Sequence, residues 1–192
     1  MSYDFFLILF SYICGSVPFG LIISYVFKTN DPRNVGSKNI GATNVLRTGN
    51  KIIGYSTLIL DILKAVIPIL FIKIQFPEFI FISSLAVFLG HVFPIWLKFN
   101  GGKGVATYVG ILFCINYILG FFFIATWLVV FFISKYSSLS SLLASLIIPI
   151  YYFFIDTENY YFFIIMFILI FYTHRENIKR LKNNTESKTK IY

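Results

Sequence analysis

The stretch VATYVGILFCINYILGFFFIATWLVVFFIS, residues 105–134, decides the fold of this chain. It contains no charged side chain, and as a single helix it would be roughly 45 Å long, whereas the hydrocarbon core of a membrane is about 30 Å thick. The stretch is therefore a membrane segment that is too long for one crossing and short for two. How it crosses sets the topology of everything that follows it.

The composition of the whole chain indicates the same class. Of its 192 residues, 58% are hydrophobic and only 12% are charged, which is too apolar for a water-soluble domain. We therefore predict an all-α integral membrane protein, a polytopic helix bundle that forms one domain over 1–192 with a short basic cytoplasmic tail at about 175–192. The other apolar segments are 5–27, expected to be the first span, and 52–74, 79–98, 139–155 and 159–173.

Charge sets the topology. The loops 28–51 and 98–104 and the tail are rich in Lys and Arg, so the positive-inside rule predicts that they are cytoplasmic. The opposite loops carry the acidic residues Glu78, Asp156 and Glu158. Segment 105–134 must then cross twice, turning near residues 116–120, or return to the side it entered. Two crossings give seven transmembrane helices with the N-terminus outside and the C-terminus cytoplasmic; five helices plus a re-entrant hairpin is the alternative. We predict seven.

Two glycine-rich loops on the cytoplasmic side are unusual for linkers. They are GSKNIGATNVLR (36–47) and GGKGVAT (101–107), and each carries a fixed cation, Arg47 in the first, which also contains Lys38, and Lys103 in the second. Glycines at this density let successive backbone N–H groups form an anion-binding nest, and a helix that follows adds a favourable dipole. The second loop lacks the spacing of a nucleotide P-loop, and no carboxylates cluster as metal ligands. We therefore predict two metal-free, phosphate-sized sites.

Other polar residues have both a structural and a functional interpretation. Asp61 and Lys64 share a helix face inside a span and can neutralise each other. His91, also inside a span, is either a structural side chain or part of an active site. His174 and Asn177 share a helical face at the cytoplasmic edge, where we expect substrate contact. Ser138 opens a helix and is either its N-cap or a site residue. Cys14 and Cys114 lie in apolar runs and indicate neither a disulfide nor a metal site.

The order of the motifs resembles the bacterial acyl-phosphate-dependent glycerol-3-phosphate acyltransferase family over nearly the whole chain. The motifs that carry the resemblance are GSVPFG (15–20), GSKNIGATNVLR (36–47), DILK (61–64), GHVFPIWLKFNGGKGVAT (90–107), KYSSLSS (135–141) and HRENIKRL (174–181). The resemblance implies an enzyme of the bacterial cytoplasmic (inner) membrane with its active site on the cytoplasmic side. Such an enzyme transfers a fatty acyl chain from acyl phosphate to the 1-hydroxyl of sn-glycerol 3-phosphate, giving lysophosphatidic acid and phosphate in the first acylation step of phospholipid synthesis.

The resemblance also implies roles for single residues. The residues that it places in catalysis, holding glycerol 3-phosphate or lying beside it, are Ser37, Arg47, Lys103, His174 and Asn177. The residues expected to line the substrate site are Gly36, Asn39, Gly41, Thr43, Asn44, Gly101, Gly102, Gly104, Thr107 and Ser138. Acyl phosphate, glycerol 3-phosphate and membrane lipid are the expected partners, with no cofactor, metal ion or nucleic acid. The chain departs from the family at Lys38 and Ala65, where glycine is usual.

The chemistry of these substrates agrees with the predicted anion sites. Acyl phosphate is an activated mixed anhydride, so no covalent enzyme intermediate is required, and catalysis reduces to positioning and charge stabilisation. The proton of the attacking hydroxyl goes either to His174 or to a phosphate oxygen of the donor. We favour the second route, with His174 orienting the acceptor. A transporter or channel for organic anions is the alternative function, but the chain shows no internal repeat.

Overall fold

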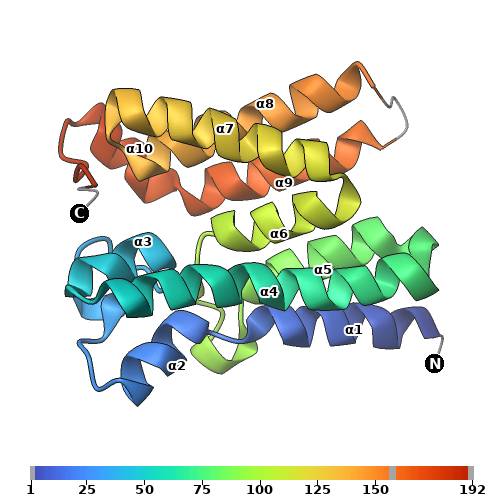
Figure 1. The fold of residues 1–192 in the computed structure, drawn as a ribbon, viewed down its shortest axis with the longest axis horizontal. Coiled ribbons are helices and arrows are strands. Elements are labelled where there is room, and N and C mark those ends of the chain that lie inside the picture. Colours follow the sequence, from blue (N-terminus) through green and yellow to red (C-terminus); the bar gives the residue numbers. More distant parts are fainter. Residues whose placement is uncertain (1–2, 156–158, 190–192) are drawn as a thin grey trace. The chain divides into compact units, whose positions relative to one another are not determined.

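A computed structural model describes residues 3–155 and 159–189 of the chain, and in these residues all regular structure is helical (Figure 1). This confirms the predicted all-α class. The chain forms two compact units, one ending at Ile115 and the other beginning at Asn116. Asp156 and Glu158, which the sequence predicts on the outer side, lie outside the described residues.

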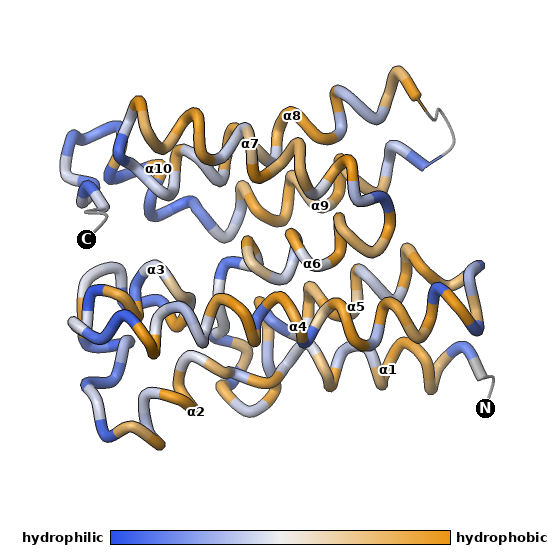
Figure 2. The backbone as a smooth tube through the Cα atoms, in the orientation of Figure 1, coloured by the Kyte–Doolittle hydropathy of each residue, from blue (hydrophilic) through white to orange (hydrophobic). Residues whose placement is uncertain are grey.

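The first unit consists of α1 (Tyr3–Ser16), α2 (Phe19–Val26), η1 (Pro32–Asn34), α3 (Ala42–Val45), η2 (Leu46–Thr48), α4 (Lys51–Gln75), η3 (Pro77–Phe79), α5 (Ile80–Val92), η4 (Ile95–Leu97) and α6 (Val105–Ile115). The second unit consists of α7 (Tyr117–Ser134), α8 (Ser137–Phe153), α9 (Tyr160–Thr173) and α10 (Arg175–Lys182). Figure 2 shows that the long helices are mainly hydrophobic. In the first unit hydrophilic residues gather in the segment between α2 and α4, and in the second they gather in α10 and the segment after it.

The apolar segment 5–27, predicted to be the first span, is not one continuous helix. It forms α1 and α2, which are bent by 41° at a break before Phe19. Pro18 explains the break, because its ring removes a backbone donor and disfavours helical geometry in the residue before it. The carbonyl of Val17 at this break accepts a 2.8 Å hydrogen bond from Lys64 Nζ. A buried lysine of α4 therefore satisfies a carbonyl at the break.

Helix α4 is the centre of the first unit and packs against α1, α2, α3, α5 and α6. The two charged side chains in the middle of this helix, Asp61 and Lys64, are only 3% exposed. Ile59, Ile67 and Ile74 on the same helix are 55%, 64% and 72% exposed. This arrangement is the reverse of that in a water-soluble helix, and it is expected where hydrocarbon surrounds the outer surface.

Helices α1 and α5 approach closely at two glycines. A Cβ atom on Gly15 would lie 2.0 Å from the Val87 carbonyl oxygen, and one on Gly90 would lie 2.2 Å from the Tyr12 carbonyl oxygen. Small residues at helix contacts of this kind let two backbones pack directly against each other, which is a common device in membrane proteins. The contact fixes α5, whose last residues support the second glycine loop.

The stretch 105–134 is divided between two helices. α6 ends at Ile115, α7 begins at Tyr117, and the Asn116 side chain accepts a 2.9 Å hydrogen bond from the Ile118 N–H as the N-cap of α7. The break lies within the predicted turn at 116–120. Two described segments, Pro77–Leu97 and Tyr117–Ser134, are long and apolar enough to cross a membrane, and α1 with α2 makes a third if the bent pair is one span. The number of crossings stays a prediction.

In the second unit, α8 packs against α7, α9 and α10. After α10 the chain reverses at Asn184, which has a left-handed φ of 57°. The Thr185 N–H donates to the Arg180 carbonyl at 2.9 Å, and the Asn184 N–H donates to the Leu181 carbonyl at 3.2 Å. These two bonds are a Schellman motif, in which asparagine is the second choice after glycine. The described part of the predicted basic tail is thus a helix, α10, followed by a segment that folds back against the unit.

Candidate active site

Asn44 organises the first glycine loop. This buried side chain accepts a 2.8 Å hydrogen bond from the Ser37 N–H through Oδ1. Its Nδ2 donates to the carbonyls of Pro32 and Asn39, both at 2.7 Å. Both amide protons are thus used within the loop. Asn44 holds the loop in this arrangement, and its expected contact with substrate stays a prediction.

Arg47 and Gly36 lie against each other at the start of this loop. A Cβ atom on Gly36 would lie 2.8 Å from Arg47 Cδ and 3.2 Å from Arg47 Nη1. Gly36 has a φ of 55°, in the left-handed region that glycine adopts without strain. Lys38, which replaces the usual glycine of the family, also has a left-handed φ of 58°. The loop therefore keeps a glycine-like backbone at Lys38 and brings the Arg47 side chain across Gly36, next to the half-buried Ser37.

The helix that follows this loop is shorter than the sequence predicts. Gly41 precedes α3, which has only four residues and contains Thr43, and η2 and Gly49 separate α3 from the long helix α4. The dipole of so short a helix is small, because the macrodipole sums over aligned peptide units. The predicted helix-dipole contribution is therefore wrong at this loop, whose positive charges are the side chains of Lys38 and Arg47.

The second glycine loop is docked on the C-terminal end of α5. The Gly101 N–H donates to the Val92 carbonyl at 3.0 Å, and the Gly102 N–H donates to the His91 carbonyl at 3.1 Å. These bonds satisfy carbonyls that a helix end leaves without partners. The nest prediction is wrong for Gly101 and Gly102, whose donors are already used. Lys103 follows them and is partly buried.

The loop leads directly into α6. Gly104 has a left-handed φ of 84°, and its carbonyl accepts the Tyr108 N–H at 2.7 Å. Thr107 lies in the first turn of α6 and is fully buried. Its hydroxyl has no hydrogen-bond partner within the described part of the chain.

The buried charges of α4 confirm the predicted pair. Lys64 Nζ lies 2.8 Å from Asp61 Oδ1 and also donates to the Val17 carbonyl. His91 Nδ1 faces the same carboxylate at 3.9 Å. The side chains of all three residues are 3% exposed, so the pair lies inside the unit beside His91.

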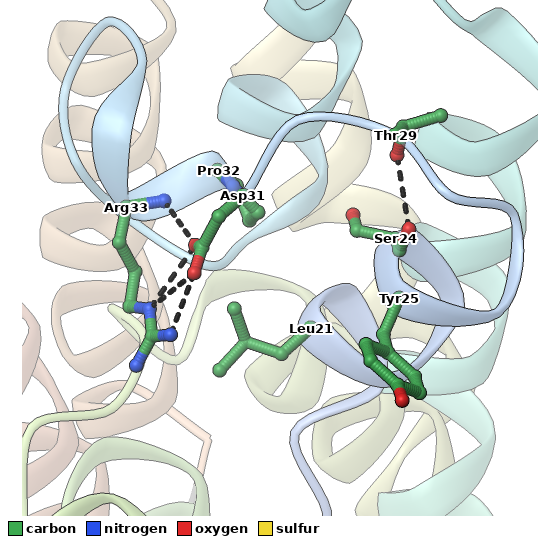
Figure 3. A pocket seen from close by; sticks show the side chains of 7 residues that line it. All are labelled: Leu21, Ser24, Tyr25, Thr29, Asp31, Pro32 and Arg33. Atoms are coloured by element: carbon green, nitrogen blue, oxygen red, sulfur yellow. Dashed lines mark hydrogen bonds and ion pairs between the residues drawn. The ribbon is translucent and has the colours of Figure 1, made fainter.

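Arg33 is not a phosphate ligand in this arrangement, although it lies close to the first loop in sequence. Figure 3 shows its guanidinium against the Asp31 carboxylate, at a pocket whose lining includes Leu21, Ser24 and Tyr25. Nε and Nη2 of Arg33 donate to Asp31 at 2.6–3.1 Å. Hydrogen bonding from Arg33 is the largest cause that holds the pKa of Asp31 below its usual value.

In the second unit, one carboxylate joins the polar residues that were predicted for the site. Ser138 Oγ donates to Glu186 Oε1 at 2.7 Å, and Asn177 Nδ2 donates to the same oxygen at 2.6 Å. Arg180 Nε donates to Glu186 Oε2 at 2.7 Å. Ser138 and Asn177 are therefore brought together by Glu186, a residue that sequence reasoning missed. The sequence signal for Glu186 is Asn184, because an asparagine just after a helix can adopt the left-handed conformation that turns the chain back toward that helix.

The surroundings of Glu186 favour its ionised form. Burial of its side chain, which is only 7% exposed, acts to raise its pKa. The hydrogen bonds from Arg180, Asn177 and Ser138, together with the positive charge of Arg180, outweigh burial and hold the pKa below the usual value of a glutamate. The carboxylate is thus a fixed negative charge beside Asn177.

His174 lies at the junction of α9 and α10 and is 2% exposed. Its Nδ1 lies 2.8 Å from the Ile170 carbonyl oxygen. A carbonyl oxygen can only accept, so Nδ1 must carry the proton in this bond, and Nε2 of the neutral ring is then the atom with a lone pair. The ring is thereby fixed in the tautomer that can accept a hydrogen bond from a hydroxyl through Nε2.

The family model described as glycerol-3-phosphate acyltransferase matches residues 5–184. A glycerol-3-phosphate acyltransferase of Pelagibacter ubique (strain HTCC1062) is 65% identical over 182 residues, covering 95% of this chain and 95% of that protein. One of Sinorhizobium medicae (strain WSM419) is 45% identical over 182 residues, covering 94% and 90%.

Two solved structures agree with the described fold. The chain resembles the crystal structure of PlsY (YgiH), an integral membrane glycerol 3-phosphate acyltransferase, in its glycerol 3-phosphate form, with a TM-score of 0.91 and 37% identity. That match covers 97% of this chain and 96% of the other. The lysophosphatidic acid form of the same protein matches with a TM-score of 0.87 and 35% identity. The chain is therefore an integral membrane protein and belongs to the glycerol-3-phosphate acyltransferase family.

Proposed function

We propose that this chain transfers a fatty acyl chain from acyl phosphate to the 1-hydroxyl of sn-glycerol 3-phosphate, without a metal ion. The observation that carries the proposal is the match over 97% of the chain to a structure of PlsY in its glycerol 3-phosphate form. The lysophosphatidic acid form of that protein supports lysophosphatidic acid as the product here. We place the reaction at the cytoplasmic face of the bacterial inner membrane, where the basic loops are predicted.

In this proposal the two glycine loops hold phosphate groups. Arg47, which lies across Gly36, and the adjacent Ser37 offer donors to one phosphate, and Lys103 offers its ammonium group. A guanidinium presents two parallel donors to phosphate oxygens, whereas an ammonium acts as a point charge. Holding both substrates in contact supplies most of the acceleration, because the donor is already activated.

The chemical step is a direct acyl transfer. The 1-hydroxyl oxygen of glycerol 3-phosphate attacks the acyl carbon, a new C–O ester bond forms, and the bond from that carbon to the phosphate oxygen breaks. The electron pair of that bond leaves with inorganic phosphate, which also takes the hydroxyl proton through one of its oxygens. Nε2 of His174 accepts a hydrogen bond from the other hydroxyl of glycerol 3-phosphate, which orients the acceptor and leaves the proton of the 1-hydroxyl for the phosphate. Asn177, held by Glu186, contacts the glycerol moiety in the same proposal.

The test is a stoichiometry measurement on the purified protein in detergent. Given acyl phosphate and glycerol 3-phosphate in the presence of a chelator, it should release one phosphate for each lysophosphatidic acid formed. Intact-protein mass spectrometry during turnover should show no acylated enzyme. Loss of activity in the chelator, or phosphate release without ester formation, would contradict the proposal.

A further inference from the structure

The second glycine loop rests on side chains of α5, and His91 is the one beneath Gly102. A Cβ atom on Gly102 would lie 2.1 Å from His91 Nε2, 2.7 Å from Cε1 and 3.0 Å from Cδ2. The imidazole therefore occupies the space that any side chain at position 102 would need. One turn earlier in the helix, the Phe88 ring lies beneath Gly104, where a Cβ atom would come within 2.1 Å of Cε2. Two rings of one helix face thus lie under the two glycines that flank Lys103.

The His91 ring is itself held from the other side. Its Nδ1 faces Asp61 Oδ1 at 3.9 Å, and Asp61 is paired with Lys64 at 2.8 Å. Lys64 also donates to the Val17 carbonyl, at the break between α1 and α2. A chain of buried contacts therefore runs from that break through α4 to the ring under the loop. Burying ionisable groups inside a membrane protein costs free energy, so this series of contacts needs a function that offsets the cost.

We propose that His91 is a positioning residue: its imidazole supports Gly102 from below, and this contact sets the place of Lys103 in the substrate site. Backbone bonds and side-chain packing act together here, because the His91 carbonyl accepts the Gly102 N–H while the His91 ring fills the space under Gly102. His91 does not touch substrate in this account. The inference rests on the proposed function, since it assigns Lys103 to a phosphate group.

The experiment is a double-mutant cycle between His91 and Gly102. Gly102→Ala should lower kcat/KM for glycerol 3-phosphate roughly tenfold to a hundredfold, because an added methyl group in a packed site forces a shift. His91→Ala should lower it by about tenfold, since the loop loses its support. The double variant should be no worse than His91→Ala alone, because the ring that the methyl group would meet is gone. Losses that multiply in the double variant would overturn the proposal.

Two matched variants separate this contact from general damage to the loop. A Cβ atom on Gly101 would meet the His91 and Val92 carbonyl oxygens at 2.1 and 2.7 Å, which are backbone atoms, so His91→Ala should not relieve Gly101→Ala. His91→Phe keeps a ring beneath Gly102, so it should not relieve Gly102→Ala either. Two results would show that the ring is not the supporting element. One is that His91→Phe restores activity to Gly102→Ala; the other is that His91→Ala restores activity equally to Gly101→Ala and Gly102→Ala.

Failure of this inference can be told from failure of the proposed function. Wild-type protein that makes no lysophosphatidic acid from acyl phosphate contradicts the proposed function alone. In that case the melting temperatures of the same variants still measure the contact, since Gly102→Ala should destabilise the protein less when His91 is already alanine. A destabilisation by Gly102→Ala that is unchanged by His91→Ala would overturn the contact itself.

Discussion

Asn177 and Glu186 are joined by a 2.6 Å hydrogen bond in which the amide nitrogen donates to the carboxylate. Asn177, in α10, is predicted from the sequence to be functional. Glu186, in the folded-back segment, is not. The same carboxylate accepts from Ser138 and Arg180, so one glutamate ties the start of α8 to α10.

Glu186→Gln should therefore destabilise the protein. Removing the charge leaves Arg180 without its carboxylate partner, which should cost about 1–3 kcal/mol because Arg180 is one-third exposed and partly screened. Glu176→Gln, the same change at an exposed position of α10, should have little effect. Thermal unfolding of the two variants in detergent is the measurement, and equal melting temperatures would contradict the role of Glu186.

The pH dependence of stability follows from the lowered pKa of Glu186. The folded protein binds the proton less readily than the unfolded chain, so the stabilisation is fully present above the unfolded pKa of about 4.3. It is lost as the pH falls through the lowered folded pKa. The melting temperature of the wild type should thus fall more below pH 4.5 than that of Glu186→Gln. Parallel plots of melting temperature against pH for the two proteins would argue against an ionised Glu186.

Arg47 and Lys103 should be sensitive even to exchange of one cation for the other. Loss of a charge-assisted hydrogen bond that strengthens in the transition state costs on the order of 2–4 kcal/mol, or roughly thirty- to a thousandfold in rate. Arg47→Ala and Lys103→Ala should therefore be nearly inactive, and Arg47→Lys and Lys103→Arg badly impaired. Lys182→Ala, at an exposed position of α10, should be close to wild type in kcat/KM. Near-full activity in both exchanges would mean that these charges serve only membrane orientation.

Asn44→Asp tests the organisation of the first loop. An aspartate would lose both donors and direct a carboxylate at the carbonyls of Pro32 and Asn39, at a cost of about 2–4 kcal/mol in stability of the loop. We expect a large fall in kcat/KM for glycerol 3-phosphate. Asn34→Asp, the same chemical change at an exposed position nearby, should be tolerated. If the two variants behave alike, Asn44 does not hold the loop.

Cysteine labelling tests the predicted topology. In a background without Cys14 and Cys114, single cysteines at the exposed positions Lys51 and Glu176 should be shielded from a membrane-impermeant reagent in intact cells. A cysteine at the exposed residue Glu78 should be labelled. Tyr117→Cys separates the alternatives for 105–134, because two crossings place it outside, whereas a re-entrant hairpin does not. Labelling at Glu176 from outside would contradict the assignment of the basic loops to the cytoplasm.

The sequence predicted what depends on composition and short spacing. Asp61 and Lys64 pair because residues three apart share a helix face, and the break at Asn116 follows from a polar residue inside a stretch too long for one span. The left-handed Lys38 keeps the backbone that a glycine would adopt, so the family motif survives the substitution.

Features that depend on contacts distant in sequence were not predictable. The N–H groups of Gly101 and Gly102 donate to carbonyls at the end of α5, so their direction depends on where that helix ends. The number of glycines in a loop does not show whether its N–H groups point to a ligand or to a helix. The break at Pro18 was readable from proline alone, but its stabilisation by Lys64, 47 residues later in the chain, was not. Glu186 reaches Asn177 only because Asn184 reverses the chain.

The most direct measurement of the central claim is kcat/KM of the purified wild-type protein with acyl phosphate and with acyl-CoA, at saturating glycerol 3-phosphate and without added metal. We expect turnover with acyl phosphate and little or none with acyl-CoA, because the proposed site holds phosphate groups and the chain has no H-x-x-x-x-D motif at His91 or His174. Equal rates with acyl-CoA would contradict it.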